Sequence, residues 1–71
     1  MTAETATFAS SNLSSGEYDP DTQELTIEFA SGDVYTYSNV PQSTWAGLKA
    51  AGSPGSFFYR QIRDRFRYSR G

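Results

Sequence analysis

Alternating apolar and polar positions in the middle of the chain predict an antiparallel hairpin. Leu25, Ile27 and Phe29 alternate with polar residues, the period-two pattern of a strand with one buried face. Ser31-Gly32-Asp33 is a tight-turn sequence, and β-branched and aromatic residues follow it. Upstream, the turn sequence of residues 19–22 joins a further strand. The predicted strands of this meander are residues 12–18, 25–29 and 34–38.

The apolar spacing becomes helical in the second half of the chain. Apolar residues at helical intervals after a proline predict a first helix over residues 41–51. A Ser/Pro/Gly loop at residues 53–56 precedes a second helix, on which Phe58, Ile62 and Phe66 form a stripe that should lie on the sheet. The predicted fold is therefore α+β, with a three-stranded antiparallel β-meander followed by two α-helices packed on one face.

The end of the second helix allows two interpretations. Arg65 lies next to the apolar stripe, where a charged side chain is unexpected. Either Arg65 extends its stem along the edge of the core, or the helix ends near Asp64 and the tail becomes extended.

Length and composition limit how such a domain is stabilised. A chain of 71 residues forms one small core, predicted over residues 11–71, and the Thr/Ala/Ser-rich residues 1–10 are predicted to be a flexible segment. The absence of Cys and His excludes disulfides and Cys/His zinc sites. Aromatic residues, 15% of the chain, are left to fill the core.

Charge is distributed unevenly along the chain. Residues 1–48 carry seven acidic side chains and no basic one, whereas residues 49–71 carry six basic side chains and one acidic one. A continuous helix would place four arginines on its solvent side, and these are Arg60, Arg63, Arg67 and Arg70. Guanidinium groups in this arrangement favour phosphate binding. Arg60, Arg63 and Arg67 could instead pair with glutamates across the sheet, or with the acidic face of a second copy; the glutamates are Glu17, Glu24 and Glu28.

Tyrosines supply the second candidate feature. Tyr35 and Tyr37 share one face of the third predicted strand because side chains two residues apart point the same way. On an exposed face they would form a stacking platform for bases, whereas beneath the helices they would fill the core, which is the interpretation we favour. Tyr59 and Tyr68 flank the arginines and complete the candidate ligand-binding set.

Enzymatic chemistry is not indicated by these residue types. Without His or Cys, general acid–base and nucleophilic catalysis would rest on carboxylates and Lys49 alone. Asp19 and Asp21 fit a turn better than a Ca²⁺ loop, and residues 53–56 lack the lysine of a phosphate-binding loop. We therefore expect a non-enzymatic protein without cofactor or metal. No membrane span or signal peptide is evident, which predicts a cytoplasmic location.

Three stretches of the chain resemble the KTSC domain family, named for its occurrence at the C-terminus of some lysyl-tRNA synthetases. They are SSNLSSGEYD, LTIEFASGDVYTYSNVP and AAGSPGSFFYRQIRDRFRY, which together span nearly all of residues 10–70. The pattern combines Tyr35-Thr36-Tyr37 and a following Val-Pro with a Ser-x-Gly and an Ile-Arg that leads to an aromatic residue.

The resemblance implies a small bacterial or phage protein of unknown function, with RNA binding suggested by the synthetase fusion. It brings no catalytic residues. Together with the arginines and tyrosines, it predicts a binding module for RNA, a nucleotide or another phosphate-bearing ligand. The alternative is a module that binds, sequesters or inhibits another protein, and either form could act as a homo-oligomer that closes a ligand pocket between subunits.

Overall fold

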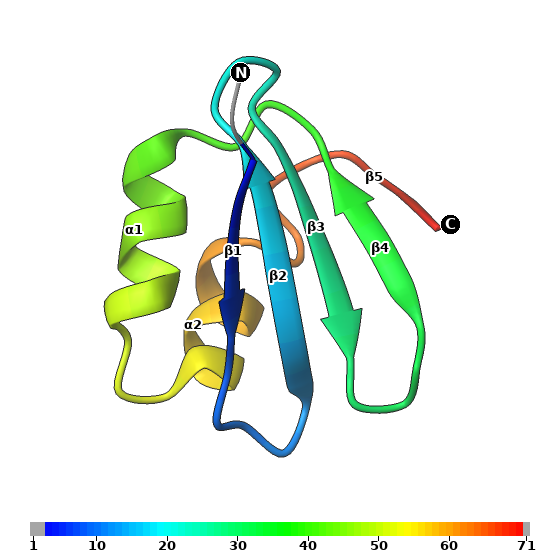
Figure 1. Ribbon diagram of the computed structural model, residues 1–71, viewed down its shortest axis with the longest axis vertical. Helices are drawn as coiled ribbons and strands as arrows, with labels where there is room; N and C mark the ends of the chain where they lie inside the picture. The colour runs from blue at the N-terminus through cyan, green and yellow to red at the C-terminus, as the bar shows by residue number, and fades with distance from the viewer. Residues whose placement is uncertain (1–2, 71) are drawn as a thin grey trace.

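A five-stranded antiparallel sheet with two helices on one face makes up the fold (Figure 1). The computed structural model describes residues 3–70. The strands follow one another across the sheet in chain order, and both helices lie between the fourth and fifth strands in the sequence. The elements are β1 (Glu4–Thr7), β2 (Leu13–Asp19), β3 (Glu24–Phe29), β4 (Val34–Tyr37), α1 (Gln42–Ala50), α2 (Pro54–Gln61) and β5 (Tyr68–Arg70).

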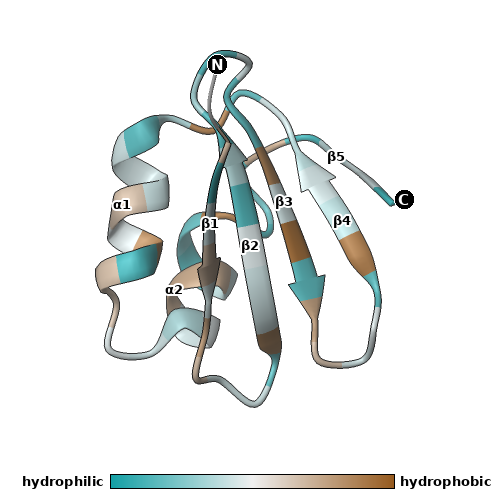
Figure 2. Cartoon of the chain, in the orientation of Figure 1, coloured by the Kyte–Doolittle hydropathy of each residue, from teal (hydrophilic) through white to brown (hydrophobic). Residues whose placement is uncertain are grey.

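The central strands confirm the predicted alternation. Leu25 and Ile27 of β3 are fully buried under the helices, whereas Glu28 is exposed on the opposite face. Figure 2 shows this alternation as brown and teal bands along β3. The hairpin to β4 turns at Gly32, whose φ of 98° is accessible to glycine without a Cβ clash.

Trp45 of α1 lies at the centre of the core. Its ring stacks on Tyr18 at a centroid distance of 5.7 Å, and a Cβ on Gly16 would lie 3.2 Å from it. The Tyr18 hydroxyl donates a hydrogen bond of 2.6 Å to the Val40 carbonyl oxygen. The Trp45 indole N–H donates to Glu4 Oε1 at 2.9 Å, so the indole ties β1 to α1.

The two helices pack closely through a glycine. A Cβ on Gly47 of α1 would lie 2.8 Å from the Phe57 ring of α2. Phe58 and Ile62, two members of the predicted stripe, are buried in the core. The third member, Phe66, is partly buried but lies beyond the end of the helix.

The prediction of three strands is wrong because strands form at both ends of the meander. β1 pairs with β2, although residues 1–10 were predicted to be a flexible segment. β5 pairs with β4, where a continuing helix was the alternative. α2 ends at Gln61, and Arg65 Nε donates to the Arg60 carbonyl oxygen at 3.1 Å, which satisfies an acceptor that the helix end leaves unpaired. The extended tail is thus the correct interpretation of Arg65.

Candidate functional site

A groove opens where the helices leave the sheet uncovered. In Figure 1, α1 lies to the left of β1 and α2 lies behind β1 and β2, whereas β4 and β5 lie on the right, away from both helices. The groove encloses about 380 Å³. We call it the aromatic groove, and its lining residues are Phe29, Ser31, Asp33, Tyr35, Tyr37, Phe58, Tyr59, Arg63, Asp64 and Tyr68.

The sheet supplies three tyrosines to one wall of the aromatic groove. Tyr37 of β4 lies directly opposite Tyr68 of β5 in the strand register, and their ring centroids are 5.6 Å apart. Tyr35 lies 5.4 Å from the same Tyr68 ring. Tyr37 is only 3% exposed, whereas Tyr68 is 57% exposed. The prediction that Tyr37 belongs to the core is confirmed, yet its side chain also lines the groove.

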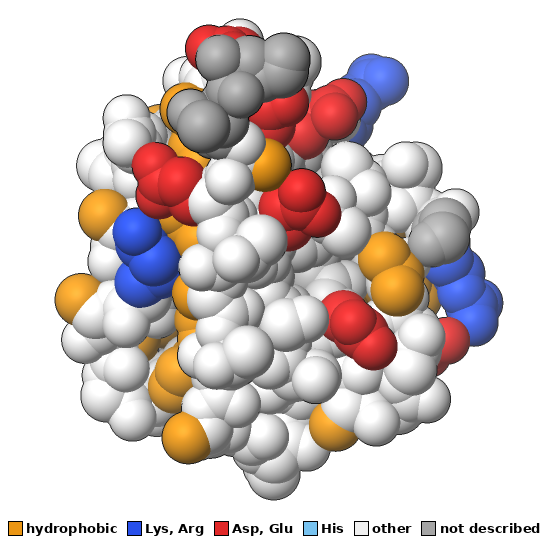
Figure 3. All heavy atoms as spheres, in the orientation of Figure 1, with side chains coloured by type: hydrophobic (Ala, Val, Ile, Leu, Met, Phe, Trp, Pro, Cys, Tyr) orange, Lys and Arg blue, Asp and Glu red, His pale blue; other side chains and the backbone are white. Residues whose placement is uncertain are grey.

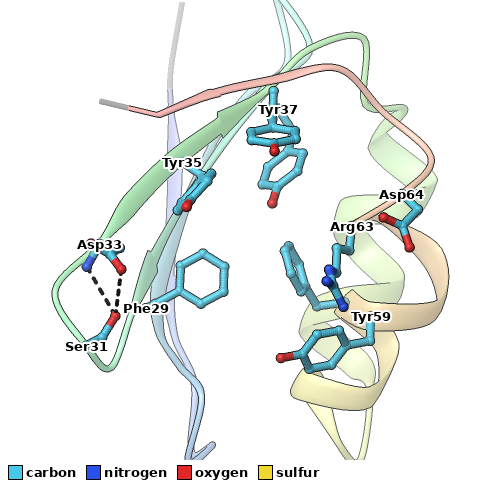
Figure 4. Close-up of a pocket in the computed structure, with 10 residues that line it drawn as sticks. Phe29, Ser31, Asp33, Tyr35, Tyr37, Tyr59, Arg63 and Asp64 are labelled. Atoms are coloured by element: carbon cyan, nitrogen blue, oxygen red, sulfur yellow. Dashed lines mark hydrogen bonds between the residues drawn. The ribbon is translucent and has the colours of Figure 1, made fainter.

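The opposite wall comes from α2 and the turn that follows it. Tyr59 is 49% exposed, and the Arg63 guanidinium lies over its ring at 5.1 Å from the centroid (Figure 4). This is a cation–π arrangement, in which the ring face attracts the positive charge. Phe58 lies deeper and meets Tyr37 edge to face at 5.5 Å. A planar ligand in this groove would therefore meet aromatic faces and a guanidinium.

Carboxylates lie at the margins of the groove. Asp33 accepts a hydrogen bond from the Ser31 hydroxyl at 3.2 Å and forms an ion pair of 3.1 Å with Arg70. The Arg70 guanidinium also lies over the Tyr35 ring, 5.9 Å from its centroid. Asp64, in the turn after α2, is exposed and forms no ion pair within residues 3–70.

Burial changes the acidity of one groove tyrosine. Desolvation raises the pKa of Tyr37 to about 12, with smaller contributions from the neighbouring Tyr68 and Tyr35. Like an unperturbed tyrosine, this phenol is protonated at neutral pH and can donate a hydrogen bond.

The four arginines of the predicted ligand-binding set do not lie on one face of a helix. Arg60 belongs to α2, Arg63 to the turn that follows, Arg67 to the connection and Arg70 to β5. Of these four, Arg63 alone lines the aromatic groove in the described chain. The prediction of a continuous arginine face is wrong because α2 ends at Gln61.

Three exposed glutamates lie on the sheet face opposite the helices, away from the aromatic groove. Glu17, Glu24 and Glu28 are exposed, and they alternate along their strands with buried residues that face the helices. Figure 3 views this open face and shows acidic side chains across it, with basic ones at its margins. In residues 3–70, no ion pair joins these glutamates to an arginine. Their predicted pairing with the arginines therefore does not occur within the described chain.

Sequence reasoning found all four groove tyrosines but missed the polar residues beside them. Ser31 and Asp33 were assigned only to a turn, and Asp64 only to the helix. One signal was available for the tail, because Phe66 and Tyr68 alternate with arginines in the period-two pattern of a strand. No signal in a single sequence shows that the hairpin tip faces α2.

Metal-binding clusters and membrane-spanning helices are both absent from residues 3–70. Nowhere in this range do three or more His, Cys, Asp or Glu side chains gather closely enough to hold a metal ion. Within the same range, no helix has both the length and the apolar character needed to cross a bilayer.

The sheet order, the two helices and the aromatic groove define a small antiparallel α+β domain with a ligand-sized site. This chain belongs to the KTSC domain family, whose pattern matches residues 9–66. A crystal structure of a KTSC domain protein from Yersinia pestis has the same fold, with a TM-score of 0.92 at 30% identity and 99% of both chains covered. The expected membership is confirmed.

Proteins of two kinds contain regions that are similar to this sequence. A lysine–tRNA ligase from Nostoc sp. is 43% identical over 51 residues, which cover 72% of this chain and 9% of that enzyme. The chain therefore matches only a small part of the ligase. An uncharacterized protein from Stutzerimonas stutzeri is 40% identical over 62 residues and is covered over 87% of its length. The domain thus occurs both within a large enzyme and as most of a small protein.

Proposed function

We propose that this domain is a non-enzymatic binding module for single-stranded RNA, with one unpaired base held in the aromatic groove. One observation carries the proposal, namely that four tyrosines from three separate elements converge with Arg63 on a single groove. Stacking on aromatic side chains and on guanidinium planes is how proteins hold unpaired bases.

The size of the groove supports a single base as the occupant. Its volume of about 380 Å³ lies near the lower end of the range for small-molecule sites. A stacked base contributes about 1–3 kcal/mol, so one base alone gives weak binding. Phosphate contacts must supply the remaining affinity.

Exposed arginines on α2 and on the segment that follows it are available for those contacts. Arg60, Arg63 and Arg67 are exposed and form no ion pair within residues 3–70. The exposed glutamates of the open sheet face lie across the sheet from the groove, where they repel a polyanion least. The match to part of a lysine–tRNA ligase is a further, associative argument for an RNA ligand.

Fluorescence anisotropy tests this proposal. Labelled single-stranded RNA, structured RNA and single-stranded DNA are titrated with wild type and with Arg60→Ala/Arg63→Ala/Arg67→Ala at several salt concentrations. Three phosphate contacts predict a plot of log affinity against log salt with a slope of about −2, which the triple variant flattens. Lys49→Ala, which removes one charge from α1, should change binding less than Arg63→Ala does.

Absence of binding at low salt by the folded protein would refute the RNA proposal. Tight RNA binding without salt dependence would contradict the proposed phosphate contacts, whereas a folded protein that binds no nucleic acid would direct the search to a protein partner. Sedimentation equilibrium tests the separate prediction that a second copy closes the groove.

A further inference from the structure

Tyr37 is almost entirely buried, yet its hydroxyl has no hydrogen-bond partner within residues 3–70. The residue is 97% buried by area, since only 3% of it is exposed. Its hydroxyl makes no hydrogen bond to any of residues 3–70. Every fully buried side-chain nitrogen or oxygen in this range does have a partner, so the Tyr37 oxygen must reach solvent, and its side chain lines the aromatic groove.

Tyr18, the other tyrosine of the buried core, differs from Tyr37 because its hydroxyl does have a hydrogen-bond partner. Both tyrosines are core residues, and Tyr18 donates its hydroxyl hydrogen to the Val40 carbonyl oxygen. Buried polar groups in proteins almost always have such a partner, because desolvation without one is unfavourable. The Tyr37 hydroxyl avoids that cost only because its oxygen reaches the groove, and no interaction within residues 3–70 requires it. The hydroxyl is thus an unused donor on a groove of ligand size.

We propose that Tyr37 is a specificity-determining residue, whose hydroxyl donates a hydrogen bond to an acceptor atom on the edge of the bound ring. This inference rests on the proposed RNA-binding function and defines the ligand class as an aromatic heterocycle with an edge acceptor, such as the carbonyl of an unpaired base. The surrounding rings of Tyr35, Phe58 and Tyr68 recognise the shape and the π-face of the ligand, which all bases share. Tyr37 adds a requirement for an edge acceptor.

Two probes and one substitution isolate that hydrogen bond. The probes are a labelled uridine hexamer and the same hexamer carrying 2,4-difluorotoluene, a ring of uracil shape that accepts hydrogen bonds poorly, in place of each base. Tyr37→Phe should weaken binding of the uridine hexamer about 5- to 10-fold, the effect of one lost hydrogen bond. Binding of the difluorotoluene hexamer should change less than about 2-fold, because the backbone and the stacking are retained.

Two measurements serve as controls. Tyr59→Phe alters an exposed hydroxyl of the same groove and should leave the ratio between the two probes unchanged. The melting temperature of Tyr37→Phe should equal or exceed that of wild type, because no bond within the chain is lost.

Each outcome decides between the two proposals. If wild type binds the uridine hexamer and Tyr37→Phe binds it equally well, this inference is wrong while the RNA-binding proposal stands. Equal losses for both hexamers would mean that Tyr37 contacts the backbone, which also overturns the inference. If wild type binds neither probe at low salt, both proposals are refuted.

Discussion

Removing the Tyr18 hydroxyl tests how much of the stability depends on one buried hydrogen bond. Tyr18→Phe keeps the ring that stacks on Trp45 but deletes the donor to the Val40 carbonyl oxygen, 2.6 Å away. Tyr18 and Val40 are both fully buried. Water therefore cannot replace the lost donor without opening the core.

The expected loss follows from the unpaired carbonyl. A buried acceptor without a partner costs about 1–3 kcal/mol. At roughly 0.05–0.15 kcal/mol per residue, a domain of 71 residues has a free energy of unfolding of only about 4–11 kcal/mol. Each lost kcal/mol lowers the melting temperature of a domain of this size by roughly 4–8 °C. Tyr18→Phe should therefore melt several degrees below wild type.

Thermal and urea denaturation, followed by circular dichroism, measure this effect. Tyr59→Phe is the matched control, because it removes the same atom from a half-exposed side chain. A Tyr18→Phe variant whose stability lies within about 0.5 kcal/mol of this control would refute the reasoning, since surface substitutions alone reach that size.

Two further predictions concern the packing of the helices and the attachment of β1. Gly47→Ala should lower the free energy of unfolding by about 1–2 kcal/mol despite better helix propensity, because the added Cβ would lie 2.8 Å from the Phe57 ring. Gly52→Ala, with no atom within 4 Å of its Cβ, should change it little. Hydrogen bonds from Trp45 and Lys49 lower the pKa of Glu4 below its usual value. This stabilising contribution is therefore present above the usual pKa and is lost as the pH falls through the lowered one. Acid titration of Trp45 fluorescence should show this loss in wild type and not in Glu4→Gln.

The parts of the fold that sequence patterns predicted are those set by local alternation. Leu25 and Ile27 are buried as predicted, and their hairpin turns at Gly32. β1 was missed because its attachment depends on distant partners, such as the indole N–H that Glu4 accepts from Trp45. β1 has only four residues, which is too short for a periodic pattern to stand out, and the alternation that leads into the three residues of β5 is similarly brief.

The sequence grouped the tyrosines but not the polar residues that surround them. The four tyrosines of the predicted ligand-binding set line one groove, together with Arg63. The arginine face was wrong because its geometry assumed helical spacing beyond Gln61. Asp33 could not be assigned to the groove from the sequence, since its position depends on how the hairpin tip meets α2 and β5.

The pairing of β4 with β5 has a consequence for the order in which the molecule assembles. Tyr37 and Tyr68 face each other across this pair, although both helices lie between them in the chain. Strands β1 to β4 join through short turns, whereas β5 must close a loop that spans residues 38–67, and the entropy cost of closure grows with loop length. We therefore expect the C-terminal strand to dock late in folding and to exchange its amide hydrogens first. A ligand in the groove would hold β5 in place. Ligand binding should therefore slow the exchange of amide hydrogens in β5.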